Sequence, residues 1–403
     1  MLCQLRLAYT KTAAGAVLAL SASAANAGII IPAGEWTVDL SGNVNSYAIW
    51  AKKSGASIGN SGFMGTGSAS TAAGQSTGLL PNFLSLSGST RQNDLDVTWL
   101  ISINPGGYSS HGASGGSGTE HRQAFMTFGD KSWGSVKIGK DLGIYAADAI
   151  LNDMTLLGVG APTVTGTTTL GRIGTGFQYA DWKQQIAYTT PNMNGFQATV
   201  GITQAWGTLS SNETSVGDLS FVSGKTGGAS PAYEGKASYS FAANDVTGKV
   251  WVSGITQKVD GVVASDNQAY SADIGANLKV AGFDLTGYYY GGEGTGTTIM
   301  FLDGYSAAKK SRDVDGGYVQ VKYALPTKTV AGISWGQSNL DRAVGETASA
   351  NLVKSNEMTT VGLYHPLTKS VNLVAEYSHI TTESQTGTQS TTNTGSLGGI
   401  LFF

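Results

Sequence analysis

Residues 122–140 read RQAFMTFGDKSWGSVKIGK, and residues 182–191 read WKQQIAYTTP. Apolar and polar residues alternate in both stretches, which is the period of a half-buried β-strand. The first stretch predicts two strands, Arg122–Phe128 and Trp133–Lys140, joined by a tight turn, and Lys183–Thr190 predicts a third. The intervening segment of about forty residues has no strand or helix period. Because so long an irregular segment is uncommon inside a compact domain, we expect the strands to close a barrel and the segment to fold inward.

The same alternation recurs along the rest of the chain. From Glu35 to Asn45, for example, Trp36, Val38, Leu40 and Val44 alternate with polar residues. Short and long connections then follow each other strictly. The short ones are Pro191–Gly195, Ala243–Asp245, Ala281–Gly282, Pro326–Lys328 and Pro366–Ser370, and the long polar ones are Gly207–Pro231, Asp260–Asn267, Gly294–Arg312, Ser338–Asn356 and Glu383–Thr394. One strand on each side of every connection gives about sixteen strands and about eight long loops, an even number as in bacterial outer-membrane barrels.

Composition favours one architecture over the whole length. The 403 residues include 57 Gly and only 8 Pro, and 13% are charged, without a linker or charge block that would divide them. Mean hydropathy near zero argues against a bundle of membrane helices. The slightly acidic chain also lacks the basic stripe that nucleic-acid binding needs.

The first 27 residues have the pattern of a cleaved secretory signal peptide. Arg6 and Lys11 precede or flank an apolar stretch, Ala13–Leu20, and Ala25-Asn26-Ala27 is a cleavage site of small residues. A retained membrane anchor is the alternative, but the apolar run is too short to span a bilayer. We therefore expect residues 28–403 to form one barrel domain. Cleavage would move the formal charge from -3 to -5 and remove Cys3, the only cysteine.

Alternation alone fits a soluble β-sandwich as well as a membrane barrel, because both have one apolar and one polar face. Three features favour the membrane barrel: the signal peptide, aromatic residues near strand ends, and the last strand. That strand ends at Leu401 and Phe403. These two residues are expected to close the barrel onto the first strand, because an open edge would leave unpaired amides in lipid.

The residues quoted above resemble the Gram-negative trimeric porin family over essentially the whole mature chain. The resemblance is carried by Arg122-Gln-Ala-Phe, Trp133–Lys140, Ile186–Pro191 with Gly195-Phe196, and the terminal Phe403. It implies a sixteen-stranded barrel, a homotrimer in the outer membrane, and a third long loop, residues 141–181, folded into the pore as a constriction. The terminal Phe is also similar to the signal that the barrel-assembly machinery recognises.

The resemblance implies acidic residues on this loop opposite basic residues on the wall. Asp148 and Asp153 are the loop candidates, with Asp141 and Asp181 at its ends, and Arg122 and Lys140 are the wall candidates. Lys140 stands where the family more often has Arg, and Asn82 and Phe83 stand where a basic residue is usual. A thinner basic wall and a negative mature chain predict a slight preference for cations.

The alternation along each strand gives a second prediction of the face on which each basic residue lies. Phe125 and Thr127 are interpreted as lipid-facing, which would put Arg122 in the lumen, or else in an ordinary interior ion pair. Lys137 and Lys140 have opposite parity, so only one can face water; the pattern favours Lys137 and the family favours Lys140. Arg172 either reaches the pore or tethers the loop to the wall.

Signatures of catalysis and metal binding are poor. Gly112-Ala-Ser-Gly-Gly116 has the spacing of a nucleophile elbow but neither the strand nor the helix that the elbow needs. Gly291–Gly296 lacks the Lys-Ser/Thr of a phosphate loop. The four histidines show no metal-ligand spacing, so no metal, cofactor or enzymatic activity is expected.

The sequence therefore predicts a passive outer-membrane channel for small hydrophilic solutes and ions, filtered by size and charge at the inward loop. A substrate-specific channel with an internal binding track is the alternative.

Overall fold

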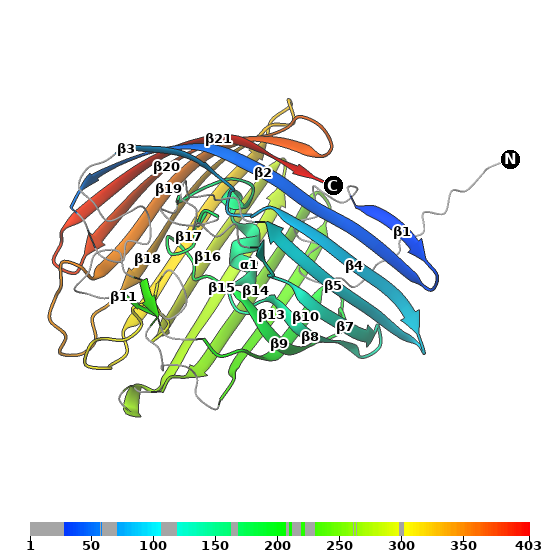
Figure 1. The fold of residues 1–403 in the computed structure, drawn as a ribbon, viewed down its shortest axis with the longest axis horizontal. Helices are drawn as coiled ribbons and strands as arrows, with labels where there is room; N and C mark the ends of the chain where they lie inside the picture. The colour runs from blue at the N-terminus through cyan, green and yellow to red at the C-terminus, as the bar shows by residue number, and fades with distance from the viewer. Residues whose placement is uncertain are drawn as a thin grey trace.

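The computed structural model describes residues 28–56, 58, 71–105, 119–162, 168–206, 209–211, 219–221, 230–260, 262, 264–297 and 302–403. The predicted signal peptide and the Gly112–Gly116 motif lie outside these residues. Almost all regular structure in the described part is β-strand (Figure 1). In chain order, the elements are β1 (Ile29–Ala33), β2 (Trp36–Gly55), β3 (Thr71–Ser76), β4 (Phe83–Gln92), β5 (Leu95–Pro105), β6 (Thr119–Glu120), β7 (Ala124–Asp130), β8 (Gly134–Leu142), α1 (Ala147–Asn152), η2 (Met154–Leu157), β9 (Trp182–Thr189), β10 (Phe196–Thr203), β11 (Leu209–Ser211), β12 (Leu219–Phe221), β13 (Ala232–Ala243), β14 (Val246–Lys258), η3 (Ala264–Asp266), β15 (Gln268–Val280), β16 (Phe283–Glu293), β17 (Asp313–Ala324), β18 (Val330–Leu340), β19 (Val353–Pro366), β20 (Val371–Ser384) and β21 (Gln389–Phe402).

Sixteen of the described strands form a closed antiparallel barrel, as the sequence predicts. Neighbours pair in chain order from β2 through β4, β5, β7, β8, β9, β10 and β13 to β21. The ring closes where β21 pairs with β2, from Asn43 opposite Phe402 to Gly55 opposite Ser390. Gly42 and Phe403 also exchange both backbone hydrogen bonds, at 2.8 and 3.1 Å. Leu401 lies opposite Val44 within this closure.

The barrel carries its large apolar side chains on the outside. Val44, Val200 and Ile274 are 60%, 58% and 58% exposed, whereas Asn43 and Asn45, on the opposite face of β2, are buried. A soluble sandwich would place these faces the other way round. The exposed apolar belt and the polar interior therefore confirm the barrel interpretation of the alternating pattern.

The predicted short connection Ala281–Gly282 is a two-residue turn, and the connection between β4 and β5 has the same form. Asn93 and Asp94, between β4 and β5, have φ of 47° and 61°, and Ala281 and Gly282, between β15 and β16, have φ of 50° and 84°. Positive φ at both central residues is the type I′ geometry that fits the twist of a β-hairpin. The short connections thereby set the register of their hairpins.

The structure adds elements that the alternating pattern did not predict. β3 lies in a Gly/Ser-rich stretch that lacks the alternating pattern, and pairs with Tyr47–Lys52 of β2. α1 and η2 lie in the long segment between β8 and β9, and Figure 1 draws α1 within the ring of strands. Buried apolar residues gather where this segment meets the wall, among them Phe177, Trp251 and Tyr318.

Neighbouring substitutions on β4 test which face meets lipid. Leu86 lies opposite Leu40 and Ile101 on the apolar face, and Ser87 lies opposite Asp39 and Leu100 on the other. Leu86→Lys should lower the free energy of unfolding in bilayers by about 2–4 kcal/mol, because it places a charge in hydrocarbon. Ser87→Lys, the control, should fold nearly as well as the wild type. The measurement is urea-dependent folding into liposomes, followed by heat-modifiable gel migration; equal losses would contradict the assignment of faces.

Candidate functional site

The segment between β8 and β9 packs against wall side chains on the face opposite the exposed apolar belt. Tyr145 Oη lies 2.8 Å from Ser271 Oγ of β15, and Ala146 N–H donates to Ser253 Oγ of β14 at 3.2 Å. Further along, Tyr318 Oη of β17 donates to the carbonyl of Ala149 at 2.8 Å. Most of the described residues from 141 to 181 are buried. The short helix α1 is therefore fixed against β14–β17.

Two buried carboxylates of the wall hold this segment by its backbone. Glu234 on β13 accepts hydrogen bonds from the N–H groups of Ile144 and Tyr145, at 2.7 and 2.8 Å. Glu376 on β20 accepts from the N–H groups of Val159 and Gly160, at 2.8 and 2.9 Å. Hydrogen bonds from N–H groups to a carboxylate are stronger than those between neutral groups. The segment is thus fastened at two points on well-separated strands.

Each of the two carboxylates also has a side-chain partner on another strand of the barrel. Lys183 Nζ lies 2.5 Å from Glu234 Oε1, and Tyr364 Oη donates to Glu376 Oε1 at 2.6 Å. A Cβ at position 158 would lie 2.0 Å from Glu376 Oε1. Gly158 is therefore required for the segment to approach this carboxylate.

Asp148 on α1 lies between two lysines of the wall. Its carboxylate is 2.9 Å from Lys236 Nζ of β13 and also pairs with Lys249 of β14. The Asp148 side chain is 6% exposed, whereas those of Lys236 and Lys249 are 24% and 33% exposed. Burial alone would raise the pKa of Asp148, but the two ammonium groups hold it below its usual value. The lysines, rather than the carboxylate, reach the interior solvent.

Asp284 is a second carboxylate that lies beside two lysines of the wall. Lys322 Nζ of β17 lies 3.0 Å from Asp284 Oδ2 of β16, and Lys279 Nζ of β15 lies 3.8 Å from the same oxygen. Lys137 on β8 pairs with Asp141 and lies 4.8 Å from the ring centre of Phe125. In each group, the carboxylate side chain is less exposed than its lysine partners.

The remaining predicted loop residues have structural contacts. Asp153 caps η2, accepting from Thr155 N–H at 2.9 Å, and it also accepts from Arg172 N–H at 3.1 Å. Arg172 is fully buried and donates from Nη1 to the carbonyl of Met358 on β19 at 2.9 Å. This is the contact that the tethering alternative for Arg172 requires.

The parity interpretation of Phe125 and Thr127 is wrong. Phe125 contacts Lys137, which is on the inner face, and Met126 is the exposed residue of β7. The error arose because Phe125 is apolar although it faces inward, where Lys137 covers it. Arg122 precedes β7, pairs with Glu120 at 2.8 Å and lies 5.9 Å from the Trp182 ring centre.

Lys140 lies on the outward-facing register of β8, whereas Lys137 lies on the inward-facing register. It pairs with Gln184 on β9 two residues after Ile138 pairs with Ile186, and Ile186 is 50% exposed. Lys137, which the strand pattern favours, lies on the inward register of β8, and its role in the pore stays a prediction. Arg122, Lys140, Lys137, Asp148 and Arg172 do not converge on one point.

Sequence reasoning missed the residues that hold the interior together. These are Glu234, Lys236, Lys249, Asp284, Lys322 and Glu376. Each has the inward parity of its strand, so the polar face could have marked them as interior. Four of them, Glu234, Lys236, Lys249 and Glu376, contact a loop more than eighty residues away in sequence, so these contacts left no local signal. Asp284 and Lys322 pair with each other between neighbouring strands.

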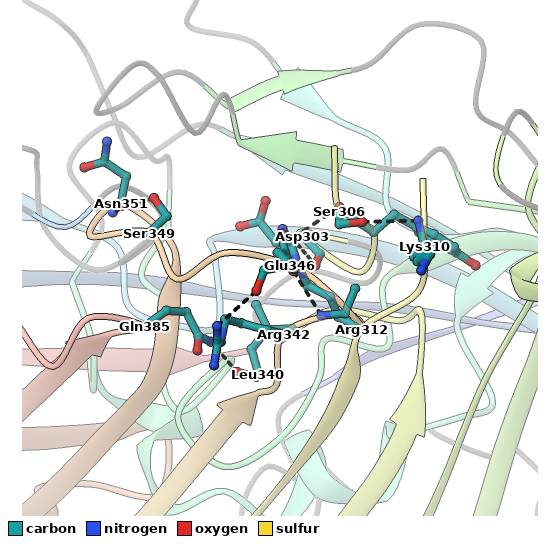
Figure 2. Close-up of polar contacts among 12 residues, drawn as sticks. Asp303, Ser306, Lys310, Arg312, Leu340, Arg342, Glu346, Ser349, Asn351 and Gln385 are labelled. Atoms are coloured by element: carbon teal, nitrogen blue, oxygen red, sulfur yellow. Dashed lines mark hydrogen bonds and ion pairs between the residues drawn. The ribbon is translucent and has the colours of Figure 1, made fainter. Parts of the chain in front are cut away.

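Buried interactions also join the connections that follow β16 and β18 (Figure 2). The Arg312 side chain donates to the carbonyls of Asp303 and Tyr305, at 2.9 and 3.2 Å, and to Glu346 through Nε at 2.9 Å and through Nη2. Gln385, after β20, donates to the carbonyls of Leu340 and Val353 at 2.6 and 3.1 Å. Arg312 thus clamps two long connections at one end of the barrel.

Among the described residues, no group of three or more His, Cys, Asp or Glu side chains could hold a metal ion. Within the same residues, no helix has both the length and the apolar character to cross a bilayer.

The arrangement defines a class: an outer-membrane β-barrel with a polar interior. A family model described as Gram-negative porin matches residues 13–385, and the chain belongs to that family. It is therefore an outer-membrane channel for passive diffusion. No curated protein matches the chain significantly in sequence.

Solved structures of porins share this fold. The outer-membrane channel DcaP of Acinetobacter baumannii superposes with a TM-score of 0.67 at 16% identity, over 94% of this chain and 100% of that one. An anion-selective porin from Comamonas acidovorans gives 0.61 at 14% identity, over 92% and 100%. OmpF of Salmonella typhi, solved with daunomycin, gives 0.56 at 15%, over 93% and 100%.

Removing the Glu376 carboxylate should loosen the segment at residues 159 and 160. Each hydrogen bond to a charged group contributes about 1.5–3 kcal/mol, so Glu376→Ala should speed amide exchange of Val159 and Gly160 at least ~10-fold. Hydrogen–deuterium exchange in detergent measures this. The control is Glu357→Ala, on the outward register of β19. Unchanged exchange in the Glu376 variant would contradict the anchoring role.

The Arg312–Glu346 clamp should open in acid. Burial would raise the pKa of Glu346, but the Arg312 guanidinium holds it below the usual value. A depressed pKa means that the stabilisation is complete above about pH 4.3, the ordinary Glu value, and is lost as pH falls through the lower folded value. Exchange of residues 303–312, corrected for the intrinsic rate, should rise below this pH.

Glu346→Gln should remove the pH dependence of this exchange, and Lys309→Gln, on the same connection, should keep it. An acid response that persists without the Glu346 carboxylate would assign the effect to another group.

Proposed function

We infer that this porin admits small hydrophilic solutes and favours anions among them. One observation carries the inference: the solvent-reaching ends of the interior ion pairs are lysines, while their carboxylate partners are more deeply buried. Lys249 is 33% exposed beside Asp148 at 6%, and Lys137 is 22% exposed beside Asp141 at 0%. A solute in the interior water meets the ammonium group first, and the field of nearby charges sets ion preference.

This proposal reverses the cation preference that net charge predicts. Formal charge counts every Asp and Glu equally, including the buried ones that the lysines neutralise. The accessible interior charge is a better guide to what a permeating ion meets, because buried, paired carboxylates present little free charge to water.

The segment between β8 and β9 would act as the constriction, residues 141–181 in the sequence prediction. Its anchoring by Glu234 and Glu376 supports a fixed obstacle rather than a moving lid. Asp148, Lys236 and Lys249 would then form the charged part of the constriction. Arg122 and Lys140 are not part of this charged group. Their contacts lie at the ends of β7, β8 and β9 that join the long connections.

Two further parts of the proposal rest on the family. The predicted cleavage after Ala27 would leave a mature chain whose first strand, β1, begins at Ile29. A homotrimer agrees with the trimer form in which OmpT of Vibrio cholerae was solved, a structure that shares this fold at 10% identity. Recognition of Phe403 by the assembly machinery remains a prediction.

Reversal potential in a planar bilayer tests the charge preference. Under a potassium chloride gradient, the wild type should give the sign of an anion-preferring channel, and Lys236→Gln combined with Lys249→Gln should shift it toward cations. The control is Lys328→Gln, in the exposed turn after β17. A cation-selective wild type, or a double variant with unchanged potential, would overturn the proposal. Solute-dependent blocking of the current would instead support a substrate-specific channel.

A further inference from the structure

The outer face of the barrel has a hollow that the channel function does not use. Its volume is about 720 Å³, which is within the range of ligand sites. It extends from β8 across β9, β10 and β13 to β14 and is lined by exposed apolar side chains, including Ile186, Val200, Ile202 and Tyr233. These residues belong to the belt that faces the bilayer.

Two glycines make the hollow. Gly235 on β13 and Gly254 on β14 lie opposite each other, in register with the outward Val200 of β10. A Cβ at position 235 would come no closer than 3.7 Å to another atom, and one at position 254 no closer than 3.4 Å. The wall therefore has room for side chains that the sequence does not supply.

Basic residues lie at the end of the hollow nearest the long connections. Lys140 is four residues beyond Val136 on the same outward register of β8, which is about 13 Å at ~3.3 Å per residue. Gln184 follows on the outward register of β9, and Lys258 ends β14. Neither Lys140 nor Lys258 forms an ion pair within the described part of the chain, although Lys140 acts electrostatically on Asp181.

We propose that this hollow binds a phosphate-bearing membrane lipid, with an acyl chain against Gly235 and Gly254 and the phosphate near Lys140. The apolar part is continuous with the lipid-facing belt, so hydrocarbon is the medium that reaches it. An ammonium group attracts phosphate, and it gains more at the edge of the hydrocarbon than in bulk water.

The charge argument selects this lipid over a second copy of the chain. An acidic partner residue would have to be buried against Lys140 within the hydrocarbon edge, whereas a lipid phosphate lies at that depth by default. The hollow also explains why Lys140 faces away from the lumen although the family resemblance puts it in the pore.

Native mass spectrometry tests the proposal on the full mature protein. The protein is released from detergent with dioleoylphosphatidylglycerol or, at equal concentration, dioleoylphosphatidylcholine. The wild type should retain the anionic lipid preferentially. Lys140→Gln should lower this retention at least ~3-fold, and Gly254→Leu, which fills the hollow, should reduce retention of both lipids.

Matched controls keep the test specific. Lys131→Gln changes a cation at the other end of the same hairpin, and Gly287→Leu fills a neighbouring hollow of about 540 Å³ on β13–β16 without touching this one. Both should bind lipid as the wild type does. Single-channel conductance, unchanged in all four variants, would show that each folds.

Three outcomes would overturn the proposal. Retention could be unchanged in both Lys140→Gln and Gly254→Leu. Gly287→Leu could lower retention as much as Gly254→Leu does, which would mean general coating of the belt. Gly254→Leu could lower the oligomeric mass instead of the lipid count, which would assign the hollow to contact between copies of the chain.

Discussion

A bilayer offers no water to unpaired backbone groups, so a sheet that spans it must leave no open edge. Every other feature of this chain depends on that constraint. β21 meets β2 over the register from Asn43–Phe402 to Gly55–Ser390, and this last pairing converts a curved sheet into a ring. Once the ring is closed, the period-two alternation of the sequence has only one meaning: one face meets lipid, and the other surrounds an interior.

The interior is organised by a different kind of contact. Glu234 and Glu376 donate no proton here; each accepts from two consecutive backbone N–H groups of the segment between β8 and β9. Such contacts depend on backbone position rather than on the identity of the segment's side chains. At these two points the identity of the segment's side chains therefore matters little, except at Gly158, where a Cβ would clash with Glu376. Asp148 adds charge to the segment at a third point.

The sequence was sufficient to predict the strands and the barrel, because the alternating pattern and the turn residues can be recognised within short stretches of sequence. Asn93-Asp94 and the glycine of Ala281-Gly282 favour the positive φ that these hairpin turns need. The interior was predicted less well, because the partners of Asp148 lie on strands that are distant in sequence. Phe125 shows the limit of parity reasoning: an apolar residue can face inward when a neighbour such as Lys137 covers its ring. Lys140 shows the limit of family resemblance, since its register places it on the outer face.

β2 is the longest strand of the described barrel, with 20 residues, and it has four partners: β1, β3, β4 and β21. β4 follows it closely along the chain, but β21 is the last of the described strands in sequence order. One edge of β2 must therefore wait for nearly the entire polypeptide before it can pair. This seam therefore carries the large loop-closure entropy that slows folds dominated by distant contacts. An escort that shields the waiting edge of β2 would shorten the period during which this chain could pair with another instead of with itself.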